Sequence, residues 1–481
     1  METLSDNWRA LPHGPVDGLA TLPTKTGPRH RSIDHYGSLR SDEVSSRGLY
    51  SQRRLWLYCG PCRRHSAPLR TIASIGPRMR RISYSAHVVN GLLTPFTAVR
   101  RDPQRALEAW RRKASAVVER SGIVPDAEDS AFADDLGFML QCFARVPGLT
   151  PIGWIGQLSN AASRLENRLR IKRIIAENPA VAAEPIDDPI FVVGLPRTAT
   201  SLTHKILARS EPHRGPLLWE LIRTDLEQDP RTTAKRIGAI EKELNATFKF
   251  SPLYDVIHPV RADQPEESIA IMPRTYFPLS CALMPDYREW LDQVDVTADY
   301  EYLKQALQVL QHGRDRRRWI LKFPGHVAHL DTIHKVFPGA QIVWTHRDPV
   351  TVMGSFCSLV ETLGRVHARG MDQHEIGRMW LGILSDSIEQ GRSKRLALPR
   401  ESVVDVSYHQ LVADPHHYVP ALYERLGAKW TNSDAANLEG VLNGPNRDRQ
   451  HEYALDRYGL SPAQVEEAFG DYSLLVANLR S

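Results

Sequence analysis

Residues 191–202 read Phe-Val-Val-Gly-Leu-Pro-Arg-Thr-Ala-Thr-Ser-Leu. An apolar strand runs here into a turn of small and hydroxyl-bearing residues, and the turn opens a helix. Such a turn directs backbone N–H groups and the positive end of the helix toward one point, where a phosphate or sulfate binds. The stretch therefore predicts an anion-binding loop at the end of a buried strand.

The same strand-and-helix pattern returns along the chain. Strands are expected at residues 189–194, 319–322, 341–345 and 403–407, and they lead into helices at residues 201–209, 326–336, 350–359 and 418–426. Alternation of this kind favours a mostly parallel sheet with helices on both faces. The predicted fold class is therefore α/β, with a P-loop-like parallel sheet.

Helices are also expected before the first strand. At residues 104–118, apolar residues recur at helical spacing after Asp102-Pro103, a pair that suits a helix start. Residues 129–145 and 155–177 also have helical character. We predict a flexible Arg-rich extension over residues 1–85, a helical N-terminal region over residues 86–185 and the α/β domain over residues 186–481.

The composition excludes several classes of protein. With 481 residues, of which 42% are hydrophobic and 24% charged, the chain is long and apolar enough for a large core. No stretch approaches the roughly 18 consecutive apolar residues of a membrane span. Five scattered cysteines do not form a disulfide framework, so we expect a reducing, cytoplasmic setting.

The net charge of +5 arises in one segment. Eleven arginines and no Asp, Glu or Lys lie between Val44 and Arg101, which leaves the rest of the chain at −6 and gives no argument for nucleic-acid binding by the body of the protein. The basic segment has four interpretations: a flexible appendage, an arm in weak contact with anionic lipid or nucleic acid, a transit peptide, or sequence upstream of a start such as Met79. Cys59-Gly-Pro-Cys62 matches a redox pair, but no helix-forming sequence follows, so we interpret the match as accidental.

The loop departs from the nucleotide-triphosphatase pattern Gly-x4-Gly-Lys-Ser/Thr. Gly194 and Ser201 fit that pattern, but Ala199 stands at the second glycine and Thr200 at the lysine. The positive charge lies earlier, at Arg197. A P-loop kinase or nucleotide triphosphatase with a displaced lysine is the alternative interpretation. The methyl group of Ala199 is tolerated in such a turn if its φ is negative.

A second anion site is expected at residues 342–355. A strand delivers Arg347, Asp348 suits a helix N-cap and Pro349 suits the first turn. Ser355 follows about two turns into that helix, so a guanidinium and a hydroxyl can grip one terminal phosphate. The tripeptide at residues 346–348 also mimics a kinase catalytic loop, but Met353 replaces the Asn that a kinase needs.

These motifs resemble those of sulfotransferases that use 3′-phosphoadenosine 5′-phosphosulfate (PAPS). Residues 196–201 are similar to the loop that binds the 5′-phosphosulfate end, and Arg347 with Ser355 is similar to the 3′-phosphate motif. The likeness extends over residues 189–472 and is strongest to bacterial sulfotransferases with a Pro-Arg-x-x-Thr loop. It implies transfer of a sulfuryl group from PAPS to an acceptor hydroxyl.

Sulfuryl transfer by such a site implies a role for each motif residue. Arg197 and Lys322 are expected against the bridging oxygen, where negative charge builds during the transfer. No metal is implied, because no paired Cys or His-Glu-x-x-His ligand set occurs in the sequence. The other donor contacts are expected from the loop and the second motif: Thr198, Ala199, Thr200, Ser201, Arg347 and Ser355.

The acceptor must lose a proton, so a general base is expected to face the loop. Glu220 is the first candidate, because it resembles a Glu shortly beyond the loop helix in tyrosylprotein sulfotransferases. His326 is the second candidate, and Glu266 and Glu267 are candidates for lining the acceptor side. Three basic residues are candidates for closing over the 3′-phosphate: Arg447, Arg449 and His451.

The acceptor is expected to be a small molecule or lipid with a hydroxyl group. Residues 216–300 should shape its pocket, and their aromatic and methionine side chains suit a bulky, partly apolar alcohol better than a small sugar. A non-catalytic nucleotide-binding protein with a decayed site is the third interpretation, and no pattern indicates an oligomeric state. The side chains concerned are Trp219, Phe248, Phe250, Tyr254, Met272, Tyr276, Phe277 and Met284.

Overall fold

A parallel sheet lies at the centre of the fold. The computed structural model describes residues 80–443 and 454–479. Its five-stranded sheet has the order β2-β3-β1-β4-β5, and all neighbouring strands are parallel. The strands are β1 (Ile190–Gly194), β2 (His213–Arg214), β3 (Arg318–Lys322), β4 (Gln341–His346) and β5 (Val403–Ser407).

The four strands expected from the sequence are confirmed. β1 is buried along its whole length between β3 and β4, which explains its uninterrupted run of apolar residues. β2 is an edge strand of two residues, too short to leave a pattern in the sequence. The predicted α/β fold class is therefore correct.

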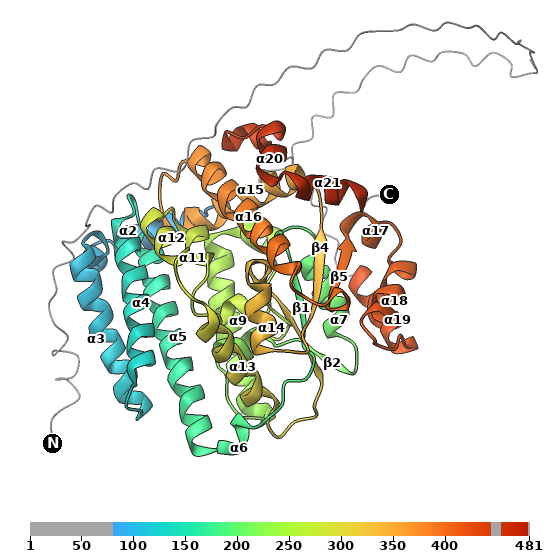
Figure 1. Cartoon of the computed structure of the whole chain (residues 1–481). Coiled ribbons are helices and arrows are strands. Elements are labelled where there is room, and N and C mark those ends of the chain that lie inside the picture. Colours follow the sequence, from blue (N-terminus) through green and yellow to red (C-terminus); the bar gives the residue numbers. More distant parts are fainter. Residues whose placement is uncertain (1–79, 444–453, 480–481) are drawn as a thin grey trace, which may run out of the picture. The chain divides into compact units, whose positions relative to one another are not determined.

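Helices cover both faces of the sheet (Figure 1). On one face, α7 (Thr200–Ala208), α17 (Tyr408–Ala413), α18 (Pro415–Arg425) and α19 (Asn432–Leu442) pack on the sheet through one apolar cluster. On the other face, Phe191 of β1 packs on Phe337 and His326. That face carries η3 (Pro324–His329), α14 (Leu330–Val336) and α16 (Gln373–Arg395), so the expected helix at residues 326–336 is divided in two.

The helical N-terminal region begins where the sequence indicates. Asp102 accepts hydrogen bonds from the N–H groups of Gln104 and Arg105 and so caps α3 (Pro103–Ser121). Trp110 of α3 is buried and donates its indole N–H to the carbonyl of Ala133 in α4 (Ala127–Arg145). Figure 1 shows α3 and α4 beside the long helix α5 (Pro151–Glu177), which in turn packs on α13 (Thr297–Gln311) and α15 (Pro349–His367).

The remaining helices join these layers. Before β1 the chain forms α2 (Tyr84–Leu93), the 3-10 helix η1 (Pro95–Arg101) and α6 (Pro179–Ala182). Between β2 and β3 it forms α8 (Leu218–Ile222), α9 (Pro230–Phe250), α10 (Pro252–Ile257), η2 (Ser268–Ala270), α11 (Phe277–Cys281), α12 (Pro285–Leu291) and α13 (Thr297–Gln311). The others are α15 (Pro349–His367), η4 (Arg400–Ser402), η5 (Leu455–Tyr458), α20 (Pro462–Phe469) and α21 (Asp471–Asn478).

Met79–Ser481 forms one compact unit of the chain. Within its described residues, no helix combines the length and the apolar character that a membrane crossing requires. The Cys59–Cys62 pair and the basic arm lie outside the described residues. The predicted boundary between residues 185 and 186 stays a prediction.

Candidate active site

The loop after β1 has an unusual backbone. At Gly194 φ is +129°, and a Cβ there would lie 2.4 Å from the carbonyl oxygen of Thr345 on β4. Arg197 and Ala199 also have positive φ, of +69° and +71°. Ala199 therefore does not avoid the left-handed conformation through a negative φ, and its methyl group is held there at a cost of about 1–2 kcal/mol.

The loop leads directly into the N-terminus of α7, which begins at Thr200. The Thr198 hydroxyl points into the protein, where it donates to the Leu195 carbonyl and contacts the Thr345 hydroxyl, each at 2.6 Å. Thr198 thus braces the loop with its side chain and has only its backbone N–H left for a ligand. A close-approach glycine and a helix N-terminus together fit a bound phosphate or sulfate group.

The second predicted anion motif meets the first at Arg197. Asp348 caps α15 by accepting from the N–H of Thr351, as the sequence predicts. Arg347 donates to the Arg197 carbonyl at 2.9 Å, and its guanidinium lies 4.0 Å from the centre of the Tyr408 ring. Ser355 Oγ accepts from Arg197 Nε at 3.1 Å. One arginine therefore joins the loop after β1 to the helix after β4.

Lys322 brings a buried positive charge to the same place. It ends β3, its side chain is only 2% exposed, and its Nζ donates to Ser201 Oγ at 3.3 Å. The same ammonium group pairs with Glu267 and lies 4.0 Å from Glu266 Oε1. The structure thus brings together Lys322, the loop and the two carboxylates that sequence analysis assigned to the acceptor side.

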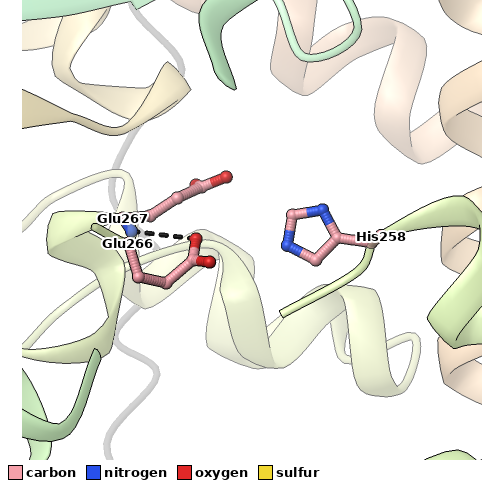
Figure 2. A group of neighbouring side chains, drawn as sticks. All are labelled: His258, Glu266 and Glu267. Carbon is pink, nitrogen blue, oxygen red and sulfur yellow. Dashed lines mark hydrogen bonds between the residues drawn. The ribbon is translucent and has the colours of Figure 1, made fainter. Parts of the chain in front are cut away.

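His258 completes this group (Figure 2). The imidazole and the carboxylates of Glu266 and Glu267 offer atoms that lie within 4.8 Å of one another, and the N–H of Glu267 donates to Glu266 Oε1 at 2.9 Å. Burial lowers the pKa of His258 below its ordinary value, so its ring is neutral at pH 7. These are metal-ligand types, but the Lys322 ammonium already supplies the cation that Glu267 contacts.

Glu220 occupies a different environment. Its carboxylate is buried at the start of α8, where it accepts from Arg214 Nη2 at 2.5 Å and from the N–H of Leu217 at 3.0 Å. Both oxygens are therefore engaged in capping the helix and pairing with an arginine. The structure does not bring Glu220 into contact with Arg197 or Lys322.

His326 lies in the interior of the protein. Its ring is fully buried between Phe191 and Phe323, and its Nδ1 makes a 2.8 Å hydrogen bond with the Tyr300 hydroxyl. Burial lowers the pKa of His326 to about 3. A general base must reach the acceptor hydroxyl, so this position does not fit the second base candidate.

Part of the evidence for an apolar acceptor pocket is also reassigned. Trp219 and Phe248 belong to a buried cluster between α8 and α9, and Met272 and Met284 are core residues as well. Arg447, Arg449 and His451 lie outside the described residues. Sequence analysis missed His258, because no motif surrounds it and only the chain's path brings it to Glu266 and Glu267.

A sequence profile of the sulfotransferase family matches residues 189–432, about half of the chain and all five strands of the sheet. The chain belongs to the sulfotransferase family. Membership favours sulfuryl transfer over the kinase or triphosphatase alternative, and it fits a loop that carries Arg197 in place of the triphosphatase lysine.

Individual relatives agree with this assignment. The chain is 28% identical over 281 residues to omega-hydroxy-beta-dihydromenaquinone-9 sulfotransferase Stf3 of Mycobacterium bovis and Mycobacterium tuberculosis, covering 56% of this chain and 69% of the relative. Sulfotransferase STF1 from M. tuberculosis has a TM-score of 0.64 at 25% identity, covering 75% of this chain and 98% of that one. For sulfotransferase STF9 from Mycobacterium avium, the TM-score is 0.67 at 26% identity, with coverage of 75% and 95%.

Proposed function

We propose that this sulfotransferase moves a sulfuryl group from PAPS to the hydroxyl group of a lipid or other small-molecule acceptor. The observation that carries the proposal is the position of Lys322 Nζ, between Ser201 of the anion loop and the carboxylate of Glu267. A cation there faces the charge that develops on the leaving oxygen, and a carboxylate beside it faces the acceptor.

The donor fits the residues of the two motifs. PAPS supplies an activated sulfuryl group on a phosphate leaving group. The loop N–H groups, Thr200 and Ser201 hold its 5′ end, while Arg347 and Ser355 hold the 3′-phosphate. Arg197, which contacts Ser355 and the Ile257 carbonyl, links the two ends of the site and borders the acceptor side.

Glu267 is the proposed general base. During the transfer the sulfur–oxygen bond to the donor phosphate breaks, a sulfur–oxygen bond to the acceptor forms, and the acceptor proton passes to Glu267. Neutral His258 orients the acceptor hydroxyl, because an uncharged imidazole nitrogen can accept or donate a hydrogen bond. The earlier candidate, Glu220, is held by Arg214 and supports α8 in this proposal.

A lipid alcohol is the proposed class of acceptor. The relative Stf3 is named as a sulfotransferase of an omega-hydroxylated menaquinone derivative. A hydroxyl at the end of an isoprenoid chain is therefore the first acceptor to assay.

Two measurements test the function. Adenosine 3′,5′-bisphosphate should bind without magnesium in isothermal titration, and labelled PAPS should transfer its sulfuryl group to hydroxylated isoprenoid quinones in preference to sugars. Magnesium-dependent binding of ATP in place of the bisphosphate would overturn the proposal. Tight bisphosphate binding with no turnover on any hydroxyl compound would support a non-catalytic binding protein instead.

A further inference from the structure

An apolar stripe runs along the outer face of α2 and into η1. Its four members recur every fourth residue and are widely exposed: Tyr84 by 70%, Val88 by 61%, Leu92 by 68% and Phe96 by 84%. A spacing of four keeps Tyr84, Val88 and Leu92 on one face of α2, and Phe96 follows them in η1. The other large exposed apolar residues of the described chain, such as Val124, Leu396 and Leu474, are single.

A basic cavity adjoins the end of this stripe. The cavity has a volume of about 530 Å³, and Thr94, two residues before Phe96, forms part of its wall. Its lining contains no acidic residue. Four arginines line it: Arg100, Arg101, Arg145 and Arg369.

The cavity retains positive charge after its internal contacts are made. Arg100 donates to the carbonyls of Leu149 and Thr97, and Arg145 pairs with the exposed carboxylate of Asp286. Arg101 and Arg369 make no side-chain hydrogen bond or ion pair within the described residues. The pKa of Arg100 is lowered by burial and by these two neighbouring arginines, as expected where cations gather without an anion.

Hydrogen bonds join the start of α2, the helix that carries the stripe, to the segment that leads to His258. The N–H of Ser83, the N-cap of α2, donates to the Phe250 carbonyl at 2.9 Å, and the Ser251 hydroxyl donates to the Arg81 carbonyl at 2.7 Å. Ser251 precedes α10, and α10 leads directly to His258. The N-terminal end of α2 is therefore joined to the segment that leads to His258.

We propose that the stripe and the cavity form a docking surface for an anionic phospholipid bilayer. The apolar side chains enter the boundary between headgroups and acyl chains, and a headgroup phosphate occupies the arginine-lined cavity. The positive charge around the stripe favours an anionic membrane as its partner. No Asp or Glu lies between Val44 and Arg101, while Arg80 and Arg101 flank the stripe. The inference rests on the proposed function only for its purpose, which is to bring a membrane-borne acceptor to the site.

Vesicle flotation with the full chain tests the surface. We expect binding to phosphatidylcholine vesicles that contain phosphatidylglycerol and weak binding to phosphatidylcholine alone. Leu92→Asp combined with Phe96→Asp should weaken binding at least about tenfold, because two apolar side chains no longer enter the lipid. Arg101→Ala combined with Arg369→Ala should weaken binding to the anionic vesicles about thirtyfold.

Two control variants match these changes. Leu396→Asp alters an apolar residue that is 88% exposed away from the stripe, and Arg378→Ala removes an exposed arginine of α16, so both should bind vesicles like the native chain. All variants should retain affinity for adenosine 3′,5′-bisphosphate, which separates failure of this surface from failure of the proposed function.

Three outcomes would overturn the docking surface. One is unchanged vesicle binding in both double variants, which would assign membrane contact to residues 1–79 or reveal a stripe covered by that segment. A second is dimerisation that the stripe variants abolish, which would make the stripe an interface between two copies. The third is binding of inorganic phosphate in the cavity together with no binding to vesicles, which would make the cavity a site for a free anion.

Discussion

The proposed donor side of the site is built from turns that follow β1 and β4, whereas the proposed acceptor side is built from short helices and loops between residues 216 and 300. On the donor side the proposed ligand groups are backbone N–H groups and side chains a few residues apart, such as Arg347 and Ser355. On the acceptor side, His258 and Glu267 come from separate loops and meet Lys322 from a strand. The comparison teaches that a site made by local backbone geometry leaves a readable motif, and a site made by convergence does not.

The largest effect is expected on the acceptor side, from Glu267→Gln. This change keeps the shape and removes the proton acceptor, so turnover should fall by about 10²–10⁴-fold while affinity for adenosine 3′,5′-bisphosphate is retained. Glu266→Gln and Glu220→Gln are the matched controls, measured by steady-state kinetics at saturating donor. A larger loss of turnover in Glu220→Gln with retained stability would return the role of base to Glu220.

The largest effect on stability is expected from Glu361→Gln, in α15, the helix that begins just after Arg347. The Glu361 carboxylate is 1% exposed and pairs with Arg81, Arg365 and Arg457, so neutralising it removes the charge shared by three partly exposed guanidiniums. The free energy of unfolding should fall by about 1–3 kcal/mol, the range for hydrogen bonds that involve a charge. Chemical denaturation measures this, and a loss below about 1 kcal/mol would contradict the role assigned to the cluster.

The same carboxylate predicts an acid transition. Burial alone raises the pKa of Glu361, but the hydrogen bond from Arg457, the charge of Arg81 and the hydrogen bond from Arg365 hold that pKa at about 2, below its ordinary 4.5. The stabilisation is therefore complete above about pH 4.5 and is lost as the pH falls toward 2. In Glu361→Gln the loss of stability over this pH range should be smaller but not absent, because the pKa values of Asp126 and Asp405 are also lowered.

Lys322→Ala tests where the two sides meet. The ammonium group acts most strongly on the charge that develops in the transition state, so turnover should fall by about 10²–10³-fold with a smaller loss of donor affinity. Kinetics and isothermal titration with adenosine 3′,5′-bisphosphate separate the two. Equal losses in turnover and affinity would assign Lys322 to ground-state binding.

On the donor side we expect the opposite result, a larger loss of donor affinity than of turnover. Arg347→Ala and Ser355→Ala should each weaken binding of adenosine 3′,5′-bisphosphate by about 1–3 kcal/mol, the range for a hydrogen bond that involves a charge. Adenosine 5′-monophosphate, which lacks the 3′-phosphate, is the matched ligand and should bind the variants and the native chain alike. Unchanged bisphosphate affinity in both variants would remove the 3′-phosphate assignment.

The smallest effect is expected from Ala199→Gly. Because Ala199 has a φ of +71°, removing its methyl group should raise the free energy of unfolding by about 1 kcal/mol. Ala234→Gly, at an exposed position in α9, is the control and should lower it by about 1 kcal/mol. Thermal unfolding compares the two, and a loss of stability in Ala199→Gly would contradict the conformation of the loop.

The sequence predicted the sheet better than it predicted the site. Strands such as Ile190–Gly194 are continuous apolar runs because both faces are covered, and capping residues such as Asp102 and Asp348 mark their helices. The edge strand β2 was missed because two residues carry no periodicity. The two predicted base candidates, Glu220 and His326, lie near motifs in the chain, but their side chains are engaged in a helix cap and buried in the core, and sequence alone does not show such packing.

The sequence by itself determined the α/β fold class, and it was enough to propose the anion loop and the second phosphate motif, because each depends on residues that are neighbours in the chain. Only the tertiary structure decided that Arg197 joins the two motifs and that Lys322 contacts Glu267. It alone also placed His258 beside the carboxylates of Glu266 and Glu267. It also decided that Ala199 lies in the left-handed region and that an apolar stripe on α2 ends at an arginine-lined cavity. Those arrangements depend on packing between segments far apart in the chain, and residue order does not encode such distances locally.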